Sequence, residues 1–152
     1  MSTYQVEGSF PIKGKIRASG NKNSALPCIA AALMTDEPVV LRNIPDIEDV
    51  GVMLDIFEKL GGSYEQVENN TYRLHAVDVV TSEIPTEQAK NIRASILFAG
   101  PLLARTGKVL LPPPGGDVIG RRRLDTHFLA FSSLGVRVEV DGVFKLTTNK
   151  LV

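Results

Sequence analysis

Apolar residues recur at helical spacing in the first third of the chain and predict two helices. The first begins at a cap formed by Asn23 or Ser24 and runs to about Met34. This segment is apolar nearly all round, so we expect its helix to be buried. The second helix begins after a cap at Asp46 and ends at Leu60. Its apolar residues lie three and four positions apart, which indicates one buried face.

Short apolar or alternating runs around these helices predict strands. They are residues 4–7, 14–18, 39–41, 63–68 and 71–75. The three apolar residues at 39–41 indicate a buried strand, and the last two runs flank Asn69-Asn70, a pair typical of a hairpin turn. Gly61-Gly62 ends the second helix, because glycine adopts a positive φ at little cost. His75 lies at a strand end without a nearby ligand-type partner, so we expect a structural or exposed role for it.

The same apolar pattern returns later in the chain. Three pairs of segments correspond: residues 39–41 with 109–111, residues 26–34 with 96–104, and residues 60–61 with 134–135. The first two pairs are offset by 70 residues and the third by 74, so four additional residues fall in the segment between them. A second hairpin is predicted around Asp141-Gly142. The sequence therefore predicts two copies of one unit with parallel-type crossovers, in an α/β or α+β fold with helices packed on sheets.

The composition is that of an ordinary soluble globular protein, with 43% hydrophobic and 22% charged residues. Its 152 residues fit one compact domain or part of a larger protein. Because the formal net charge is zero, no global field attracts nucleic acid or acidic membranes, and we expect neither as a partner. The start of the chain has no long apolar run and no signal-peptide pattern, which favours a cytoplasmic location.

The single cysteine, Cys28, excludes an internal disulfide framework. It lies in the first predicted helix. Free cysteines of this kind usually pack as small apolar residues, so we expect Cys28 in the core rather than as a nucleophile.

A loop rich in proline and glycine, residues 112–116, leads through Asp117 to three arginines and a helix start. Glycine allows the backbone to approach a ligand closely, and proline stiffens the preceding segment. Arginines at 121–123 cannot share one face of an element, and their guanidinium groups suit phosphate and carboxylate oxygens. By itself, the loop is equally consistent with a solvated turn that carries surface charge.

The repeat places two cations at corresponding positions. The offset of 70 puts Lys22 and Asn23 on Ile92 and Arg93, at the start of the first apolar helix of each copy. Helix N-termini carry partial positive charge, so a cation beside each would form an anion site. Taken alone, Arg93 is equally well explained as a packing or solvated arginine. The helix after Arg93 contains Gly100-Pro101, which should kink it or shift its start.

Three stretches of the sequence resemble UDP-N-acetylglucosamine enolpyruvyl transferases (1-carboxyvinyltransferases). They are residues 14–27, residues 93–96, and residues 114–120 with Arg122, Asp125 and His127 after them. The resemblance runs from the N-terminus to the end of the chain without large gaps. The related 3-phosphoshikimate 1-carboxyvinyltransferases usually carry Asp-Lys-Ser where this chain has Asn21-Lys22-Asn23.

The resemblance implies transfer of the enolpyruvyl group of phosphoenolpyruvate to the 3′-hydroxyl of UDP-N-acetylglucosamine, with release of phosphate. This is the first committed step of peptidoglycan synthesis, and it requires no metal or organic cofactor. By the same resemblance, Lys22 and Asn23 contact phosphoenolpyruvate and the sugar, and Arg93 binds the nucleotide sugar or the phosphate. Arg122 holds the phosphate of phosphoenolpyruvate. The uridine and diphosphate lie against Arg122, Arg123, Leu124, Asp125 and Thr126.

The chain departs from the family's pattern at two site positions. The family usually has a cysteine on its mobile loop where this chain has Asp117. An aspartate delivers a proton to the methylene carbon only if burial keeps it protonated. A carboxylate also lacks the thiolate nucleophile that fosfomycin exploits, which implies resistance. Arg123 replaces the usual proline and so changes the setting of the nucleotide contacts.

Enzymes of this family are longer, with two domains that each hold three βαβαββ units in an inside-out barrel. The resemblance implies that residues 1–20 form strands that pack with the second domain. Residues 21–83 and 84–152 would be the first two units, with the third unit and the second domain absent. We therefore expect an N-terminal portion of the enzyme, inactive alone and prone to self-association. The alternative is a stand-alone module that binds nucleotide sugars or phosphorylated ligands without catalysis.

Overall fold

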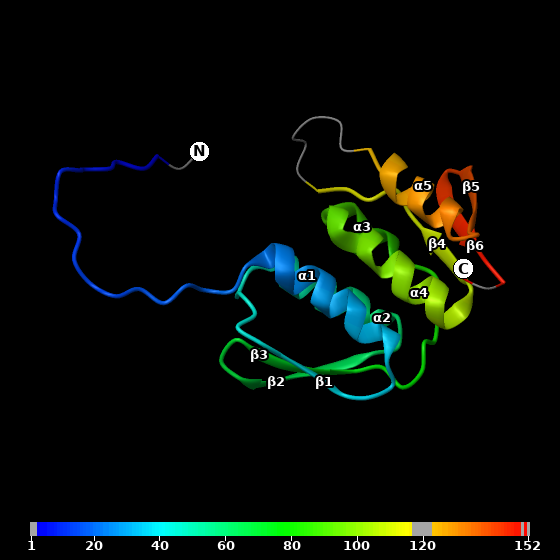
Figure 1. Ribbon diagram of the computed structural model, residues 1–152, viewed down its shortest axis with the longest axis horizontal. Coiled ribbons are helices and arrows are strands. Elements are labelled where there is room, and N and C mark those ends of the chain that lie inside the picture. Colours follow the sequence, from blue (N-terminus) through cyan, green and yellow to red (C-terminus); the bar gives the residue numbers. More distant parts are fainter. Residues whose placement is uncertain (1–2, 117–122, 150, 152) are drawn as a thin grey trace.

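Helices and strands alternate along the chain in the computed structural model, which describes residues 3–116, 123–149 and 151 (Figure 1). In chain order the elements are α1 (Lys22–Ala31), η1 (Ala32–Met34), β1 (Val39–Arg42), α2 (Glu48–Lys59), β2 (Ser63–Glu68), β3 (Thr71–His75), α3 (Thr86–Asn91), η2 (Arg93–Phe98), α4 (Ala99–Thr106), β4 (Lys108–Leu111), α5 (Asp125–Ser133), β5 (Arg137–Asp141) and β6 (Val143–Thr147). The η elements are short 3₁₀ helices.

Each half of the described chain forms a three-stranded antiparallel sheet with the same connectivity. The strand orders are β1-β3-β2 and β4-β6-β5. Both predicted hairpins are present, and a residue in the left-handed region closes each turn, Asn70 at φ 56° and Gly142 at φ 66°. The two glycines that correspond across the repeat, Gly61 and Gly135, also have positive φ, at 112° and 83°. The predicted internal repeat and the mixed fold class are confirmed.

A parallel crossover is found in the second half of the described chain. Glu83 forms a parallel bridge with Leu110 of β4. The amide of Ile84 donates to the carbonyl of Leu110, and the amide of Leu110 donates to the carbonyl of Ser82, both at 2.9 Å. In the first half no described segment pairs with the outer edge of β1. The crossover predicted for both copies is therefore seen in one.

The strands predicted at 4–7 and 14–18 are not formed. Residues 3–19 are exposed, without regular structure, and extend away from the folded body (Figure 1). The alternating pattern there is compatible with a strand. A strand, however, needs a neighbour for its backbone hydrogen bonds, and no described segment lies beside this one.

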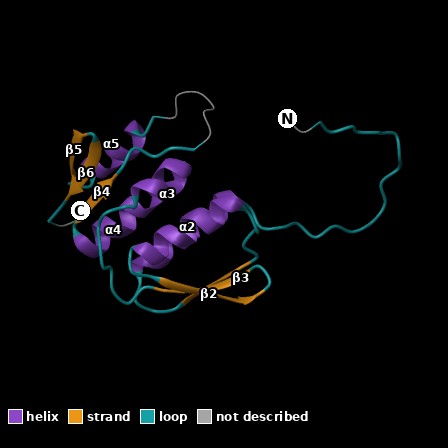
Figure 2. Cartoon of the chain, turned by 180° about the vertical axis from the view of Figure 1, so that it is seen from behind, coloured by secondary structure: helices purple, strands orange, loops and turns teal. Residues whose placement is uncertain are grey.

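The core lies where helices of the two halves meet. Figure 1 shows α1 to α4 between the two sheets, and Figure 2 shows the same layering from behind. Helix α1 contacts α2 and η2, and α4 contacts η1. Among the fully buried side chains are Leu33, Phe57, Phe98 and Leu102. Burial of such side chains contributes about 1.5–3 kcal/mol each, so the contact between the halves stabilises both.

Helix α1 corrects two predictions. It begins at Lys22, because the side chain of Asn21 accepts the amide of Asn23, so Asn21 is the cap rather than Asn23 or Ser24. One face of α1 is buried, but Cys28 is exposed and is not a core residue. The apolar sequence of α1 thus covers an open face as well as a packed one.

Helix α2 and strand β1 also differ from the prediction. Helix α2 begins at Glu48 after Ile47, so Asp46 does not cap it. Strand β1 alternates between partly buried and exposed residues, with Val40 43% exposed, rather than being buried throughout. The expected break near Gly100-Pro101 is present: η2 gives way to α4, and Pro101 falls in the first turn of α4. Among the described helices, none has the length and apolar character that crossing a membrane requires.

Candidate functional site

The starts of three helical elements surround one pocket of about 800 Å³. Lys22 opens α1, Glu48 opens α2 and Arg93 opens η2. The described polar residues that line it are Lys22, Asn23, Glu48, Asp49, Lys90, Asn91 and Arg93. Apolar side chains from the same elements line the remainder, among them Leu26 and Leu97. The pocket therefore lies between the two copies of the repeat, at their equivalent ends.

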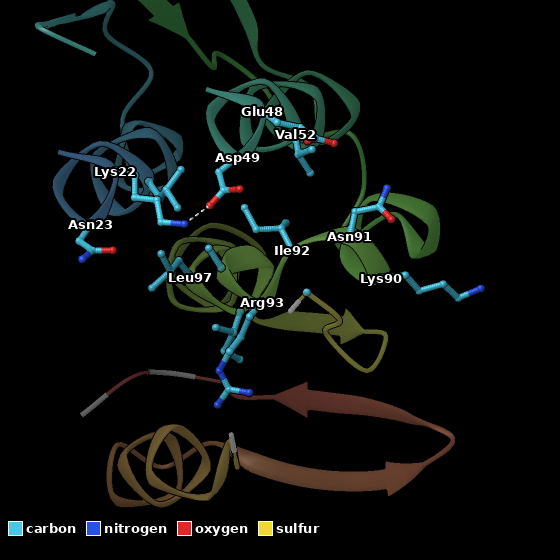
Figure 3. Close-up of a pocket in the computed structure, with 14 residues that line it drawn as sticks. Lys22, Asn23, Glu48, Asp49, Val52, Lys90, Asn91, Ile92, Arg93 and Leu97 are labelled. Atoms are coloured by element: carbon cyan, nitrogen blue, oxygen red, sulfur yellow. Dashed lines mark hydrogen bonds and ion pairs between the residues drawn. The ribbon is translucent and has the colours of Figure 1, made fainter. Parts of the chain in front are cut away.

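Lys22 and Asp49 point toward each other between α1 and α2 (Figure 3). Their Nζ and Oδ2 atoms are 2.7 Å apart, which makes a charged hydrogen bond. The Lys22 side chain is half exposed, and two of the three N–H donors of its ammonium group remain for water or a ligand. The cap at Asn21 fixes the backbone from which Lys22 extends.

Arg93 points from η2 toward the ribbon of α5 (Figure 3). Its Nη2 atom donates to the carbonyl oxygen of Arg123 at 2.7 Å. Arg123 in turn pairs through Nε with Oδ2 of Asp125 at 2.7 Å. Leu124 is the buried N-cap residue of α5, with Asp125 and Thr126 exposed in the first turn. The segment 123–126 is therefore hydrogen-bonded to Arg93, although it does not line the pocket.

The start of the Pro/Gly loop is fixed beside the same pocket. The amide of Gly115 donates to the carbonyl of Ala89 at 2.8 Å, and that of Gly116 to the carbonyl of Lys90 at 3.2 Å. Gly116 lines the pocket. The two residues of greatest chemical interest on this loop, Asp117 and Arg122, lie outside the described residues.

The structure thus brings Lys22, Asn23 and Arg93, which the repeat places at equivalent positions of the two copies, to one pocket. Asp49 and Lys90 also line this pocket and were not predicted from the sequence. A signal for Asp49 was present, since the offset of 74 that aligns Leu60 with Leu134 also aligns Asp49 with Arg123.

The described lining carries three cations, Lys22, Lys90 and Arg93, against two carboxylates. The N-termini of α1 and α2, helices of 10 and 12 residues, add partial positive charge. Such a site suits a phosphate or carboxylate group that is held from several sides. Among the described residues, no group of His, Cys, Asp or Glu side chains is placed to hold a metal ion.

Comparison with known families decides the family. Residues 6–149 match the profile of EPSP synthase (3-phosphoshikimate 1-carboxyvinyltransferase). The chain belongs to the EPSP synthase family. Within this family it is similar to UDP-N-acetylglucosamine 1-carboxyvinyltransferases, at 63% identity to that of Treponema denticola and 64% to that of Treponema pallidum. Each comparison covers the whole chain but 36% of the relative, so this EPSP synthase family member spans about a third of their length.

Solved structures of the family have the same fold. The enolpyruvyl transferase NikO from Streptomyces tendae matches 92% of the chain, with a TM-score of 0.75 and 27% identity, over 31% of its own length. EPSP synthase from Acinetobacter baumannii matches 90% of the chain with a TM-score of 0.64. At 17% identity, the second match shows similarity of the fold alone. The predicted enolpyruvyl transferase architecture is therefore confirmed.

Proposed function

We propose that this chain is part of an enzyme that transfers the enolpyruvyl group of phosphoenolpyruvate to the 3′-hydroxyl of UDP-N-acetylglucosamine and releases phosphate. The observation that supports it is the convergence of Lys22, Asn23 and Arg93 on one pocket beside Gly116, where the Pro/Gly loop begins. The names of relatives at 63% and 64% identity support the choice of acceptor.

The chemistry requires both a proton donor and fixed cations. The acceptor hydroxyl adds to C2 of phosphoenolpyruvate while a proton adds to the methylene carbon, which gives a tetrahedral intermediate. Loss of phosphate and of a proton from the new methyl group then restores the double bond. Charge develops around C2 and the departing phosphate, so preorganised cations lower the barrier. Lys22 and Arg93 are suited to this role by position.

Residues of the loop supply the remaining roles in this proposal. Asp117 delivers the proton to the methylene carbon, and Arg122 binds the phosphate of phosphoenolpyruvate. Arg123, Leu124, Asp125 and Thr126 hold the uridine and diphosphate. The hydrogen bond from Arg93 to the carbonyl of Arg123 supports this grouping, because it links the pocket to that segment.

The proposal extends to the whole protein. We propose a cytoplasmic enzyme of peptidoglycan synthesis that resists fosfomycin, in which residues 21–83 and 84–152 are two of three repeats in one domain and residues 1–20 pack with a second domain. The exposure of residues 3–19 supports the last point, since five large apolar side chains lie uncovered there. These are Tyr4, Val6, Phe10, Ile12 and Ile16.

The test measures phosphate release with both substrates. One sample is the chain of residues 1–152. The other is a chimera in which these residues replace the matching 36% of the Treponema denticola relative. We expect the chimera to release phosphate only when both substrates are present, and the chain alone to release none. A chimera that is folded but inactive would contradict the proposed reaction. Binding of UDP-N-acetylglucosamine by both samples without turnover would instead favour a binding module.

A further inference from the structure

Lys22 and Arg93, the two cations at equivalent places in the repeat, are each held at the start of the helix that follows the first strand of their copy, which is α2 after β1 and α5 after β4. In the first copy, Nζ of Lys22 donates to Oδ2 of Asp49 in the first turn of α2. In the second copy, Nη2 of Arg93 donates to the carbonyl oxygen of Arg123, directly before α5. Both distances are 2.7 Å.

The acceptors also correspond across the repeat. The 74-residue offset that aligns the ends of the second helices, Leu60 with Leu134, places Asp49 on Arg123. One copy thus uses a charged carboxylate as acceptor and the other uses a neutral carbonyl. The shared feature is an oxygen atom at that place, and its charge differs.

We propose that Asp49 is a positioning residue, which holds the Lys22 ammonium so that its remaining donors face the phosphate or carboxylate of the substrate. This inference rests on the proposed function. A lysine side chain loses rotamer freedom when it is fixed, which costs free energy. Because Asp49 orders the Lys22 side chain before the ligand binds, this entropic cost does not reduce the affinity for the ligand. Positioning by an oxygen acceptor contrasts with a second reading, in which Asp49 is a negative charge that opposes anion binding.

Variants of the 152-residue chain separate the two readings. Asp49→Ala removes the acceptor and the charge. Asp49→Asn keeps an acceptor oxygen without the charge, and so imitates the carbonyl of the second copy. Glu48→Ala is the matched control, because Glu48 lies in the same helical turn and lines the same pocket. Its side chain makes no ion pair or hydrogen bond with the described residues.

Two measurements are made on each variant. The first is ¹⁵N relaxation at Nζ of Lys22 in the ligand-free chain, which reports how far the ammonium is ordered. The second is the Kd for phosphoenolpyruvate from an NMR titration. We expect Asp49→Ala to disorder the ammonium and raise Kd about fivefold, the upper range for an exposed charged pair. Asp49→Asn should keep most of the order, with Kd within about twofold of the parent. Glu48→Ala should leave the ammonium ordered, with an equal or lower Kd.

The outcomes are distinct. If Asp49→Ala lowers Kd as a charge removal at Glu48 would, Asp49 acts by repulsion and the proposal is wrong. Equal order of Lys22 in the parent and in Asp49→Ala also overturns it. If the ammonium is ordered by Asp49 but neither the variants nor the chimera binds phosphoenolpyruvate, the positioning contact stands and the proposed ligand fails.

Discussion

Gly115 shows at the residue scale why the loop can begin where it does. A Cβ atom at this position would lie 1.6 Å from the carbonyl oxygen of Lys90, far inside van der Waals contact. The two backbones lie this close because the amides of Gly115 and Gly116 donate hydrogen bonds to carbonyls at the end of α3. Glycine is required here by the close approach of two backbones.

We predict that Gly115→Ala lowers the free energy of unfolding by about 1–3 kcal/mol, because the chain must give up those two hydrogen bonds to make room. Gly51→Ala is the control. Gly51 lies in α2 with open space around its Cβ position, so alanine there should stabilise by about 0.5–1 kcal/mol. Urea denaturation of both variants measures the difference. An unchanged midpoint for Gly115→Ala would mean that the loop does not begin against α3.

Asp117 carries the prediction about chemistry. In the chimera, Asp117→Asn should abolish turnover, because an amide cannot deliver a proton. Asp117→Cys should retain turnover and gain sensitivity to fosfomycin, since its thiolate can be alkylated. Substantial activity in the Asn variant would exclude Asp117 as the donor. Insensitivity of an active Cys variant would mean that the loop differs from that of the family.

At the element scale, the sequence predicted which elements exist better than where they begin. Neighbouring polar residues at 21–24 all suit a cap, and only the folded backbone selects Asn21. Residues 14–18 have the pattern of a strand, but a strand depends on a partner that local sequence does not reveal. Cys28 is exposed because an apolar helix can leave one face uncovered.

Arg105 joins elements that are distant in the sequence. From α4 its guanidinium donates to the carbonyls of Leu33, Ala76 and Val77, at 3.2, 3.3 and 2.7 Å. It thus connects the end of η1 and the segment after β3 to the second copy. The three carbonyls lie where the two halves of the core meet.

We predict that Arg105→Ala destabilises the chain by about 2–3 kcal/mol, because three carbonyls lose a charged donor. Arg73→Ala should cost less than about 1 kcal/mol, since Arg73 forms an exposed pair with Glu65 at 3.4 Å. Thermal and urea unfolding give both values. Equal effects of the two substitutions would show that Arg105 does not join the halves.

Tyr64 on β2 gives a prediction for alkaline pH. Burial, and then the charges of Asp55 and Glu58 on α2, raise the pKa of its phenol above the ordinary value of 10.0. In the unfolded chain the phenol therefore loses its proton at a lower pH, so stability should fall as the pH rises above about 10. Tyr64→Phe should flatten this part of the stability curve, while Tyr4→Phe, at an exposed position, should not. Urea midpoints between pH 9 and pH 11 would test the difference, and a parallel decline in both variants would contradict it.

At the scale of the whole molecule, the internal repeat predicts the fold of each copy and the positions of two of the pocket's cations. Offsets of 70 and 74 predicted two copies of one unit and placed Lys22 and Arg93 at equivalent positions. The structure adds that the two sheets have the same strand connectivity and that both cations line one pocket. The ion pair of Lys22 with Asp49 spans 27 residues and depends on how α1 packs against α2. Contacts of that kind follow from tertiary packing and carry no local pattern.

The packing also changes the expectation for self-association. The expected self-association depends on two apolar runs, 25–34 and 96–103, that would lose a neighbour in the absence of the third repeat. In the second run, however, Ile96, Phe98 and Leu102 are buried. Within the first copy, an apolar stripe on the outer side of α1 and η1 remains uncovered, where Pro27, Cys28, Ala31 and Met34 are all exposed. Exposed apolar patches of this kind commonly mediate association.

We predict that two or more chains associate through the stripe, so that the melting temperature rises with protein concentration. Reaction of Cys28 with a thiol reagent should slow over the same range, because association covers it. Ala31→Lys should abolish both effects by placing a charge in the contact, whereas Ser132→Lys, on the exposed side of α5, should preserve them. A monomer at every concentration, with constant Cys28 reactivity, would show that the stripe stays exposed to water and does not mediate association. That result would favour a stand-alone binding module, because two repeats would then suffice for a stable fold.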